Sequence, residues 1–453
     1  MRELIKQLKS HINRFLVDVV NILTSKERLR QLFRIPIYSN ALYLMIANAA
    51  NALLGFAFWI IVARLYSPED VGLASAIIAA VGLLAAFSQL GLGMGLIRFL
   101  PHSSRNASSM INTVFSMGTL TSIAAALIFI AGLGFWSPAL LFIRHNLVYL
   151  AAFGLFTIAS TLFTLIGQTF VAERRAGFTL ANNLIFSLLK LLLLILLAAF
   201  FHTFGIFASW GISLVVAFLL SAFLFLPRVQ ADYRPRFAIS RGVTNEIMHF
   251  SFANYLSGLF WGAPILLLPI IVVNLLGAEP NAYFYIAWAT GSVLAMIPAA
   301  VSTSLFAEGS HEEERLGLNI WRSLKMVLLL LVPAVVLMLA IGDKVLLLFG
   351  ASYSENATTL LRIFAIAALP LAVNTIYLAV KRVERKLRVI VGLSAFVGAV
   401  TIGLTYMLLP RMGINGAGIA WLTAQVIGAL VIVVSSFLKR MAVRGNRRRS
   451  GIS

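Results

Sequence analysis

Cysteine is absent from this chain of 453 residues, and histidine and acidic residues are scarce, with six His and 16 Asp and Glu in all. Without cysteine there is no disulfide, no thiolate metal ligand and no thiol nucleophile. The six histidines form no pair at i, i+4 spacing, which a helical metal site would need. No Walker-type phosphate-binding sequence occurs. We therefore expect no metal, no cofactor and no enzymatic activity.

Charged residues are also few, at 11% of the chain, whereas 60% of the residues are hydrophobic and the mean hydropathy is +0.94. Soluble domains carry roughly 25% charged residues. The apolar residues gather in stretches of about 20, the length that crosses a hydrocarbon core. The sequence therefore predicts an all-α polytopic membrane protein with twelve transmembrane helices, at residues 39–65, 71–97, 111–135, 147–171, 179–201, 206–226, 250–275, 282–306, 324–341, 357–380, 389–409 and 416–437.

The net charge of +20 is distributed unevenly along the chain. The two termini and the even-numbered connections between predicted spans hold 30 of the 36 Lys and Arg residues, and the odd-numbered connections hold only Arg144, Lys344 and Arg411. Basic residues mark the cytoplasmic side of a membrane protein. Both termini are therefore predicted to be cytoplasmic, in a multi-pass protein of the cell (inner or plasma) membrane. Topology explains the excess charge, so no nucleic-acid partner is expected.

The two ends of the chain have their own pattern. Residues 1–38 place Leu4, Leu8, Ile12 and Phe15 at helical spacing among basic residues, which predicts an amphipathic helix lying on the bilayer surface. Docking of a cytoplasmic partner is the alternative role. Residues 438–453 form a basic cytoplasmic tail.

Two pairs of segments indicate an internal repeat. ARLYSPEDVGLASA (63–76) and NLLGAEPNAYFYIA (274–287) begin 211 residues apart, and FGIFASW (204–210) and MGINGAG (412–418) begin 208 apart. The chain is therefore expected to form two six-helix lobes, 39–226 and 250–437, joined by a cytoplasmic linker at 227–249. Six is an even number, so the lobes share an orientation and enclose a cavity between them.

These segments, together with LGLGMGLIRFLP (90–101), carry a family resemblance. From about residue 39 to 437 the chain resembles the polysaccharide-biosynthesis branch of the multidrug/oligosaccharidyl-lipid/polysaccharide exporter superfamily. The resemblance implies a V-shaped, MATE-like transporter that moves a polyprenyl-diphosphate-linked oligosaccharide, such as an undecaprenyl-linked repeat unit, from the cytoplasmic to the outer leaflet. The partners it implies are the lipid bilayer, the anionic lipid-linked glycan and glycan-assembly enzymes. Drug and organic-cation antiporters share the fold, so the fold does not fix the substrate.

Lys190 is the strongest candidate for a substrate-binding residue. It lies near the middle of the predicted span 179–201, where a lysine costs roughly 2.5–3.5 kcal/mol on insertion scales. Asn183, Ser187 and Lys190 follow at i, i+4, i+7 and share one helix face. We interpret Lys190 as a cavity charge that binds an anion. The alternatives are snorkelling to the interface and a hydrogen bond to a helical carbonyl.

Further candidates are carboxamides and one arginine. Asn48 and Asn51 in the first span, and Asn254 in the seventh, can hydrogen-bond to sugars, although such residues also pack between membrane helices. Arg362, a turn or so inside the outer end of the tenth span, is a candidate for the cavity mouth, whereas Arg64 is expected to reach the outer interface.

All 16 acidic residues fall in tails, loops or helix ends. The spans therefore offer no carboxylate for Na⁺, a proton or an organic cation. This disfavours a cation antiporter and favours an anionic substrate.

Prolines and glycines also bear on the mechanism. Five prolines fall within predicted spans of the second lobe and none within spans of the first, so the second lobe is expected to deform more easily, with static kinks as the alternative: Pro264, Pro269, Pro298, Pro333 and Pro370. The spacing of Gly91, Gly93 and Gly95 indicates close helix packing.

Two rivals come from other classes. A membrane polysaccharide polymerase or ligase needs catalytic groups at the outer face, where the longest predicted loop is about fifteen residues, around 342–356. A scaffold would dock cytoplasmic enzymes through the basic ends of the chain.

Overall fold

The structure is a computed structural model that describes residues 36–103, 106–198, 202–231, 233–311 and 316–449. Most of the predicted amphipathic segment 1–38 lies outside these residues, as does the end of the tail. Every regular element of the described part is a helix. Twelve of these helices are long and apolar enough to cross a membrane, which confirms the all-α, twelve-span prediction.

The first lobe contains six long helices and several short ones. The long helices are α3 (Pro36–Leu65), α4 (Pro68–Ser88), α6 (Ala107–Ala131), α9 (Leu147–Ala172), α10 (Ala176–Leu197) and α11 (His202–Leu220). The short elements are α5 (Leu92–Phe99), η1 (Leu100–His102), α7 (Leu133–Trp136), η2 (Pro138–Leu140), α8 (Phe142–His145), η3 (Ser221–Phe225) and α12 (Leu226–Val229).

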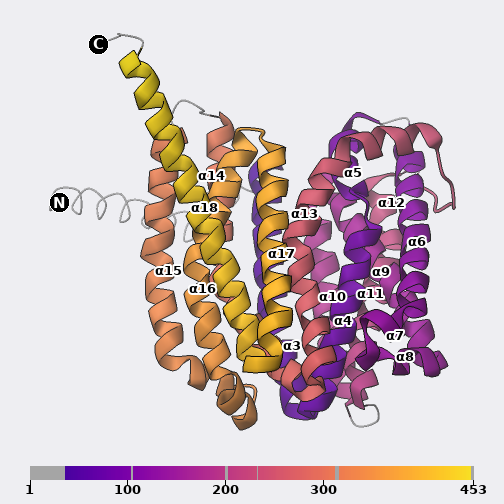
Figure 1. The fold of residues 1–453 in the computed structure, drawn as a ribbon. Helices are drawn as coiled ribbons and strands as arrows, with labels where there is room; N and C mark the ends of the chain where they lie inside the picture. The colour runs from indigo at the N-terminus through magenta and orange to yellow at the C-terminus, as the bar shows by residue number, and fades with distance from the viewer. Residues whose placement is uncertain (1–35, 104–105, 199–201, 232, 312–315, 450–453) are drawn as a thin grey trace, which may run out of the picture.

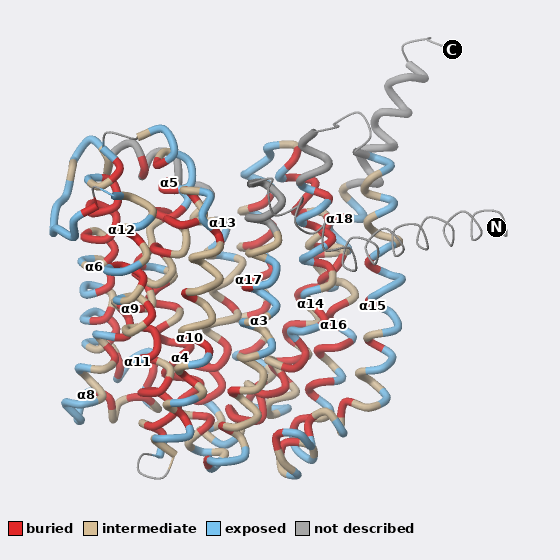
Figure 2. Tube along the Cα trace, turned by 180° about the vertical axis from the view of Figure 1, so that it is seen from behind, coloured by how far each residue is buried: buried red, intermediate tan, exposed pale blue. Residues whose placement is uncertain are grey.

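The second lobe contains six long helices: α13 (Arg241–Leu276), α14 (Ala278–His311), α15 (Leu316–Leu347), α16 (Ala351–Val383), α17 (Leu387–Met412) and α18 (Ile414–Arg449). Figure 1 shows two groups of helices that part at the end where α18 finishes and meet at the other end. In Figure 2 the exposed residues lie mainly on the outward faces of the helices. Large apolar side chains such as Leu192, Leu329 and Val336 are exposed there, as a lipid-facing surface requires.

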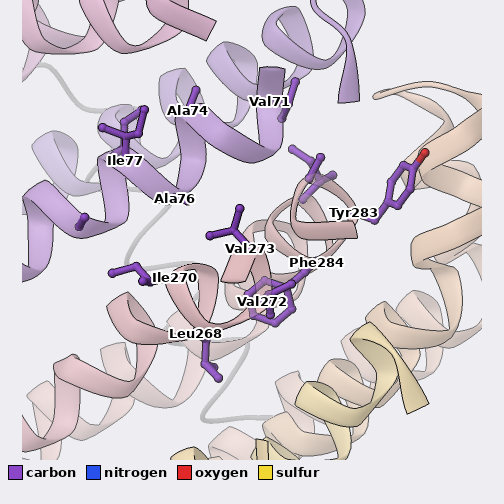
Figure 3. Packing of buried hydrophobic residues seen from close by; sticks show 14 of the residues in the cluster. Val71, Ala74, Ala76, Ile77, Leu268, Ile270, Val272, Val273, Tyr283 and Phe284 are labelled. Atoms are coloured by element: carbon purple, nitrogen blue, oxygen red, sulfur yellow. The ribbon is translucent and has the colours of Figure 1, made fainter. Parts of the chain in front are cut away.

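The lobes are packed tightly where they meet. Figure 3 shows the side chains of this junction, and Val71 and Ala74 of α4, Val273 of α13 and Phe284 of α14 all belong to one buried hydrophobic cluster. Glycine makes the approach of α4 and α14 possible, because a Cβ at Gly72 would lie 1.7 Å from the carbonyl oxygen of Ala278.

One predicted span is broken in the structure. The sequence predicts a single helix over 71–97, but α4 ends at Ser88 and α5 begins at Leu92. Between them Leu90 (φ 44°) and Gly91 (φ 78°) adopt left-handed backbone conformations, which end an α-helix. The predicted close packing is confirmed for two of the three glycines, since a Cβ at Gly93 would collide with Gln168 and one at Gly95 with Ile247.

The outer loop predicted around 342–356 is also wrong. α15 continues to Leu347 and α16 begins at Ala351, so the connection is only residues 348–350. The longer connection at that end of the molecule lies between α6 and α9 and contains α7, η2 and α8.

The repeat is visible in a turn that sequence inspection missed. Arg174 and Arg385, 211 residues apart, both have a left-handed backbone, with φ of 56° and 55°. Each follows a glutamate, and the surrounding backbone hydrogen bonds match one for one, from Glu173 N to Thr169 O and from Glu384 N to Val380 O onward. A left-handed arginine is unfavourable, so its recurrence indicates a duplicated backbone turn.

The linker between the lobes is bound to the first lobe. Residues 233–240 run alongside α6 without regular structure, and side chains of α6 accept hydrogen bonds from alternate amides: Asn112 from Arg236, Ser116 from Ala238 and Thr113 from Ser240. α13 already begins at Arg241, within the predicted linker 227–249. Its residue Ile247 is fully buried in the core of the first lobe, against side chains such as Leu92 and Leu96.

Candidate functional site

A cleft of about 590 Å³ lies between the lobes, at the end of the molecule where the ribbons part in Figure 1. This is also the end that carries the basic connections, with Arg98, Arg174 and Arg385, and we call it the basic end. The interlobe cleft is lined by Ala86, Gln89, Gly91, Gly93, Met94, Gln168, Tyr255, Gly258, Leu259, Gly262, Ala263, Leu266, Phe306, Arg382, Leu387 and Ile390.

Helix α13 provides the largest part of this lining. A Cβ atom at Gly258 or Gly262 would meet no atom within 4 Å, so this face of α13 opens onto free space. The hydroxyl of Tyr255 donates a hydrogen bond to the carbonyl oxygen of Phe87 at 2.9 Å and ties α13 to α4. The cleft wall on this side therefore combines one helix from each half of the sequence.

The cleft carries positive charge only. Arg382, at the end of α16, is the single charged residue among the lining residues of the described chain, and no carboxylate is present there. Gln168 adds an amide whose Oε1 is buried without a hydrogen-bond partner among the described residues. Chemically, such a surface can receive an anion at the basic end but offers no carboxylate to neutralise a cation.

The opposite end is closed by hydrogen bonds between the lobes. The guanidinium of Arg64, at the end of α3, donates to the carbonyl oxygens of Leu347 and Leu348 at the end of α15. The amide of Asn274, at the end of α13, donates to Trp136 O at 3.1 Å and accepts from Ala139 N at 3.1 Å. Arg64 therefore holds the second lobe rather than only reaching an interface.

A third contact lies between these two. Asn281 of α14 donates to the carbonyl oxygen of Gly72 at 2.7 Å and to the hydroxyl of Ser75 at 3.2 Å, both on α4. All three residues are buried. The lobes are thus open at the basic end and bonded together at the other.

Lys190 is a residue of α10 whose side chain faces α3, and Lys190 is 6% exposed. The ammonium is 5.1 Å from the ring centroid of Phe58 and 4.7 Å from that of Phe186. No ion pair of Lys190 is present among the described residues, and Lys190 does not line the interlobe cleft. The two rings stabilise a partly dehydrated cation without neutralising it.

The predicted polar face around Lys190 is present on α10. Ser187 donates a hydrogen bond to Asn51 of α3 at 3.2 Å, so Ser187, Lys190 and Asn51 meet along one helix pair. Asn48 and Asn51 are exposed, and a side chain at Gly55 on α3 would meet no atom within 4 Å. Asn183 is half-buried, whereas its neighbour Asn182 is buried and accepts a hydrogen bond from Ser221 at 2.8 Å.

The other predicted residues are dispersed. Arg362 is exposed on α16 and does not belong to the cleft lining. The helix at Asn254 is placed, but its side chain lies outside the described residues. The five prolines all lie inside helices: Pro264 and Pro269 in α13, Pro298 in α14, Pro333 in α15 and Pro370 in α16.

Sequence reasoning missed the residues that line the cleft. Tyr255, Gly262 and Arg382 were not singled out, and Gln168 and Gly258 carried no site assignment. Two signals were available on α13: the face that Asn254, Gly258 and Trp261 form at helical spacing, and the run of small residues in GLFWGAP. Small residues in membrane helices usually indicate packing.

A family model described as "Polysaccharide biosynthesis protein" matches residues 61–358, more than half of the chain. No curated protein matches the chain. Among solved structures, the lipid II flippase MurJ in an inward closed conformation superposes with a TM-score of 0.75 at 13% identity, covering 87% of each chain.

Two further structures extend the comparison. An inward-facing multidrug resistance MATE family transporter of the MOP superfamily gives a TM-score of 0.64 at 16% identity, over 90% of this chain and 99% of its own. A MOP superfamily transporter from Pyrococcus furiosus gives 0.60 at 17% identity, over 91% and 98%. At these identities the likeness establishes a shared fold. The chain is therefore a multi-pass membrane protein that belongs to the polysaccharide biosynthesis protein family.

Proposed function

We propose that this protein is a flippase that moves a polyprenyl-diphosphate-linked oligosaccharide from the cytoplasmic to the outer leaflet by alternating access. The observation that carries the proposal is an interlobe cleft that opens at the basic end and is lined by Arg382 and no carboxylate. A diphosphate headgroup enters such a cleft without like-charge repulsion. A cation finds no carboxylate there.

The basic end corresponds to the cytoplasm in this proposal. The positive-inside rule places both termini and the even-numbered connections there. The sugar-bearing headgroup enters the cleft from the cytoplasmic leaflet, while the polyprenyl chain stays in the lipid. The contacts of Arg64, Asn274 and Asn281 close the outer end until the headgroup is bound.

Lys190 is the second cation on the path in this proposal. It lies deeper than Arg382, since Arg382 is at the end of α16 and Lys190 is in the middle of α10. Arg382 attracts the diphosphate at the entrance, and Lys190 binds it within the membrane once the α3 and α10 seam opens. Asn48, Asn51 and Asn183, with Asn254 from α13, replace part of the hydration of the sugars, and Arg362 acts near the outer mouth.

The membrane potential supplies a driving force. Moving one charge through 100 mV is worth about 2.3 kcal/mol, so a diphosphate of charge about −2 gains about 4.6 kcal/mol when it leaves an inside-negative cell. Export of an anion therefore proceeds without a bound ion, which agrees with described spans whose carboxylates lie only near the helix ends.

The test is flipping in proteoliposomes that contain the purified full chain and a fluorescent lipid-diphosphate oligosaccharide. We expect the lipid to exchange faster than in protein-free vesicles, and faster still when a potential draws anions across. If the protein is instead an organic-cation exporter, the lipid should exchange no faster than in protein-free vesicles. Transport of ethidium without any flipping of the lipid would contradict the proposal.

A further inference from the structure

A second hollow, of about 390 Å³, lies inside the second lobe among α13, α14, α16 and α18. Three of the seven tryptophans of the chain line it. We call it the Trp pocket, and its lining residues are Trp261, Ile265, Trp288, Gly291, Ser292, Ala295, Ala299, Phe364, Ala368, Leu371, Thr375 and Trp421.

The rings of this pocket meet edge to face. Trp288 lies 4.9 Å from Trp421 and 5.0 Å from Phe364 between ring centroids, with interplanar angles of 84° and 89°. Trp288 also stacks on Phe284, with ring centroids 6.3 Å apart, so at most one flat face of Trp288 is available to a third partner. Across the pocket, α14 presents small residues at Gly291, Ser292 and Ala295, which leave room for a ring-sized ligand.

The polar groups of the Trp pocket are few and specific. No described residue accepts a hydrogen bond from the indole N–H of Trp261, Trp288 or Trp421, and none of these three nitrogens is among the fully buried polar atoms that lack a partner. Ser292 and Thr375 donate their hydroxyl protons to carbonyls of their own helices, at 2.7 and 2.8 Å, so their oxygens remain acceptors. No charged side chain lines the pocket.

These properties select one ligand chemistry. A hydrocarbon would strip water from the indole N–H groups and offer them no acceptor. An ionised ligand would find no opposite charge. An uncharged sugar ring satisfies both conditions, because its hydroxyls accept from indole N–H groups while its C–H faces pack on the rings.

We propose that the Trp pocket binds an uncharged sugar residue of the transported glycan. The inference rests on the proposed function and adds a substrate preference to it. Trp261 and Gly262 are successive residues of α13 that line the Trp pocket and the interlobe cleft respectively, so a glycan in the cleft is one helix away from the pocket. The equivalent positions of the first lobe lack this chemistry. The repeat offsets of 211 and 208 make Ile77 the counterpart of Trp288 and Ser213 the counterpart of Trp421.

The experiment compares three probes on the full chain in detergent: farnesyl diphosphate, farnesyl diphosphate bearing an N-acetylglucosamine disaccharide, and the same lipid bearing a hexuronic acid. We expect the neutral disaccharide lipid to bind at least about tenfold more tightly than the bare lipid. Trp288→Ala and Trp421→Ala should reduce this advantage below about threefold and leave binding of the bare lipid unchanged. Trp288→Phe, which keeps a ring but removes the N–H donor, should give an intermediate value and keeps the test valid if the alanine variants fail to fold.

Trp321→Ala is the matched control, because Trp321 is an exposed tryptophan of α15 outside the pocket. It should retain the full advantage. Equal loss of affinity for the bare lipid in Trp288→Phe would assign the pocket to the hydrocarbon, and tight binding of the hexuronic acid lipid would remove the preference for a neutral sugar. Failure of the unaltered protein to bind any of the three lipids would overturn the proposed function. Normal flipping with an unchanged sugar preference in the Trp variants would overturn the pocket assignment alone.

Discussion

The two lobes repeat the same order of helices but differ in what those helices contain. The first lobe carries the lysine in the middle of a span, and its prolines in described helices stand in first turns, at Pro36, Pro68, Pro101, Pro138 and Pro227. The second lobe carries prolines inside α13 to α17 and the three tryptophans of the Trp pocket. The two lobes thus share backbone features, such as the turns at Arg174 and Arg385, but differ in the side chains that their helices carry. The comparison teaches that the two halves share backbone geometry, whereas the lysine in the middle of a span belongs to the first lobe and the prolines inside long helices and the Trp pocket belong to the second.

The largest effect is expected at Lys190, which gives the first lobe its charge. Lys190→Ala should abolish lipid translocation while membrane abundance stays near that of the unaltered protein, because removing a charge from a span eases insertion. Lys190→Arg should keep part of the activity, and Lys190→Glu should be the worst. Flipping in proteoliposomes, normalised to the inserted protein, measures this.

Lys325→Ala is the control for Lys190, since Lys325 also lies over a ring, that of Trp321 at 4.9 Å, but on α15. It should flip lipid at the normal rate. If the Ala and Glu variants of Lys190 are as fast as the unaltered protein, the charge of the first lobe plays no part in transport.

The next effect concerns the paired contacts that close the end opposite the basic end. Arg64→Ala removes the contact from α3, the first helix of the first lobe, to the end of α15, the third long helix of the second lobe. Asn274→Ala removes the contact from α13, the first helix of the second lobe, to Trp136 in the connection that follows α6, the third span of the first lobe. Because the chain has no cysteine, Ser75→Cys provides a single buried reporter beside Asn281. Labelling of this cysteine by a membrane-impermeant maleimide should become about three- to tenfold faster in both variants, as expected for the loss of about 1 kcal/mol of closing free energy.

Asn356→Ala serves as the control, because the Asn356 amide donates only within its own helix, to Ser352 O. It should not change labelling. Labelling that stays slow in both Arg64→Ala and Asn274→Ala would mean that apolar packing alone holds this end closed.

A smaller effect is expected from the prolines of the second lobe. Pro264→Ala or Pro298→Ala restores a helical N–H donor, so the helix should become straighter and more stable. We expect a higher unfolding temperature together with transport that is about two- to fivefold slower. Pro227→Ala, in the first turn of α12, is the control and should alter neither quantity much. Unchanged transport in the second-lobe variants would identify the kinks as static.

The smallest effect concerns the duplicated turns at the basic end. Burial raises the pKa of Glu384, but hydrogen bonds from Lys381 and Lys386, both at 2.7 Å, outweigh this and hold the pKa below its ordinary 4.5. A lowered carboxyl pKa stabilises the folded protein above pH 4.5, and this contribution is lost as the pH falls through the lowered pKa.

Glu384→Gln should therefore lower the unfolding temperature by about 1 °C at pH 7, consistent with less than about 1 kcal/mol for a partly exposed pair. The difference should vanish at low pH. Glu173→Gln in the first lobe, where the partner is the neutral Gln230, should show a smaller difference at pH 7. If the unfolding temperatures of the two variants depend on pH in the same way, the lysine partners of Glu384 do not distinguish the turn of the second lobe from that of the first.

Local pattern was sufficient for much of the fold. Hydropathy runs predicted twelve spans because a membrane requires about twenty apolar residues and internally satisfied backbone groups. Helical periodicity placed Ser187 and Lys190 on one face, and in the structure both contact α3, through Asn51 and Phe58. The break at Leu90 and Gly91 was not predicted, since an apolar run continues through it.

The residues that line the cleft could not be predicted from local sequence patterns. Its lining depends on how the lobes are placed relative to each other, so Gly258 and Gly262 line free space, although small residues usually pack. Arg382 lies in the last turn of α16, within a basic segment that was predicted as a loop and whose charge was explained by topology alone. The Trp pocket unites residues from four helices, and nothing in the spacing of Trp261, Trp288 and Trp421 indicates that they meet.

Residues 233–240 are attached to α6, so the segment that packs as the first lobe extends beyond the six helices of the first repeat. A gene fragment that ended after α12 would contain all six helices of the first repeat but would lack Ile247, which fills the core of that lobe beside Leu92 and Leu96. Co-expression of two half-chains should therefore succeed when the chain is divided within the 312–315 connection and fail when it is divided at residue 232. During synthesis, the first lobe reaches its final packing only after the start of α13 has left the ribosome.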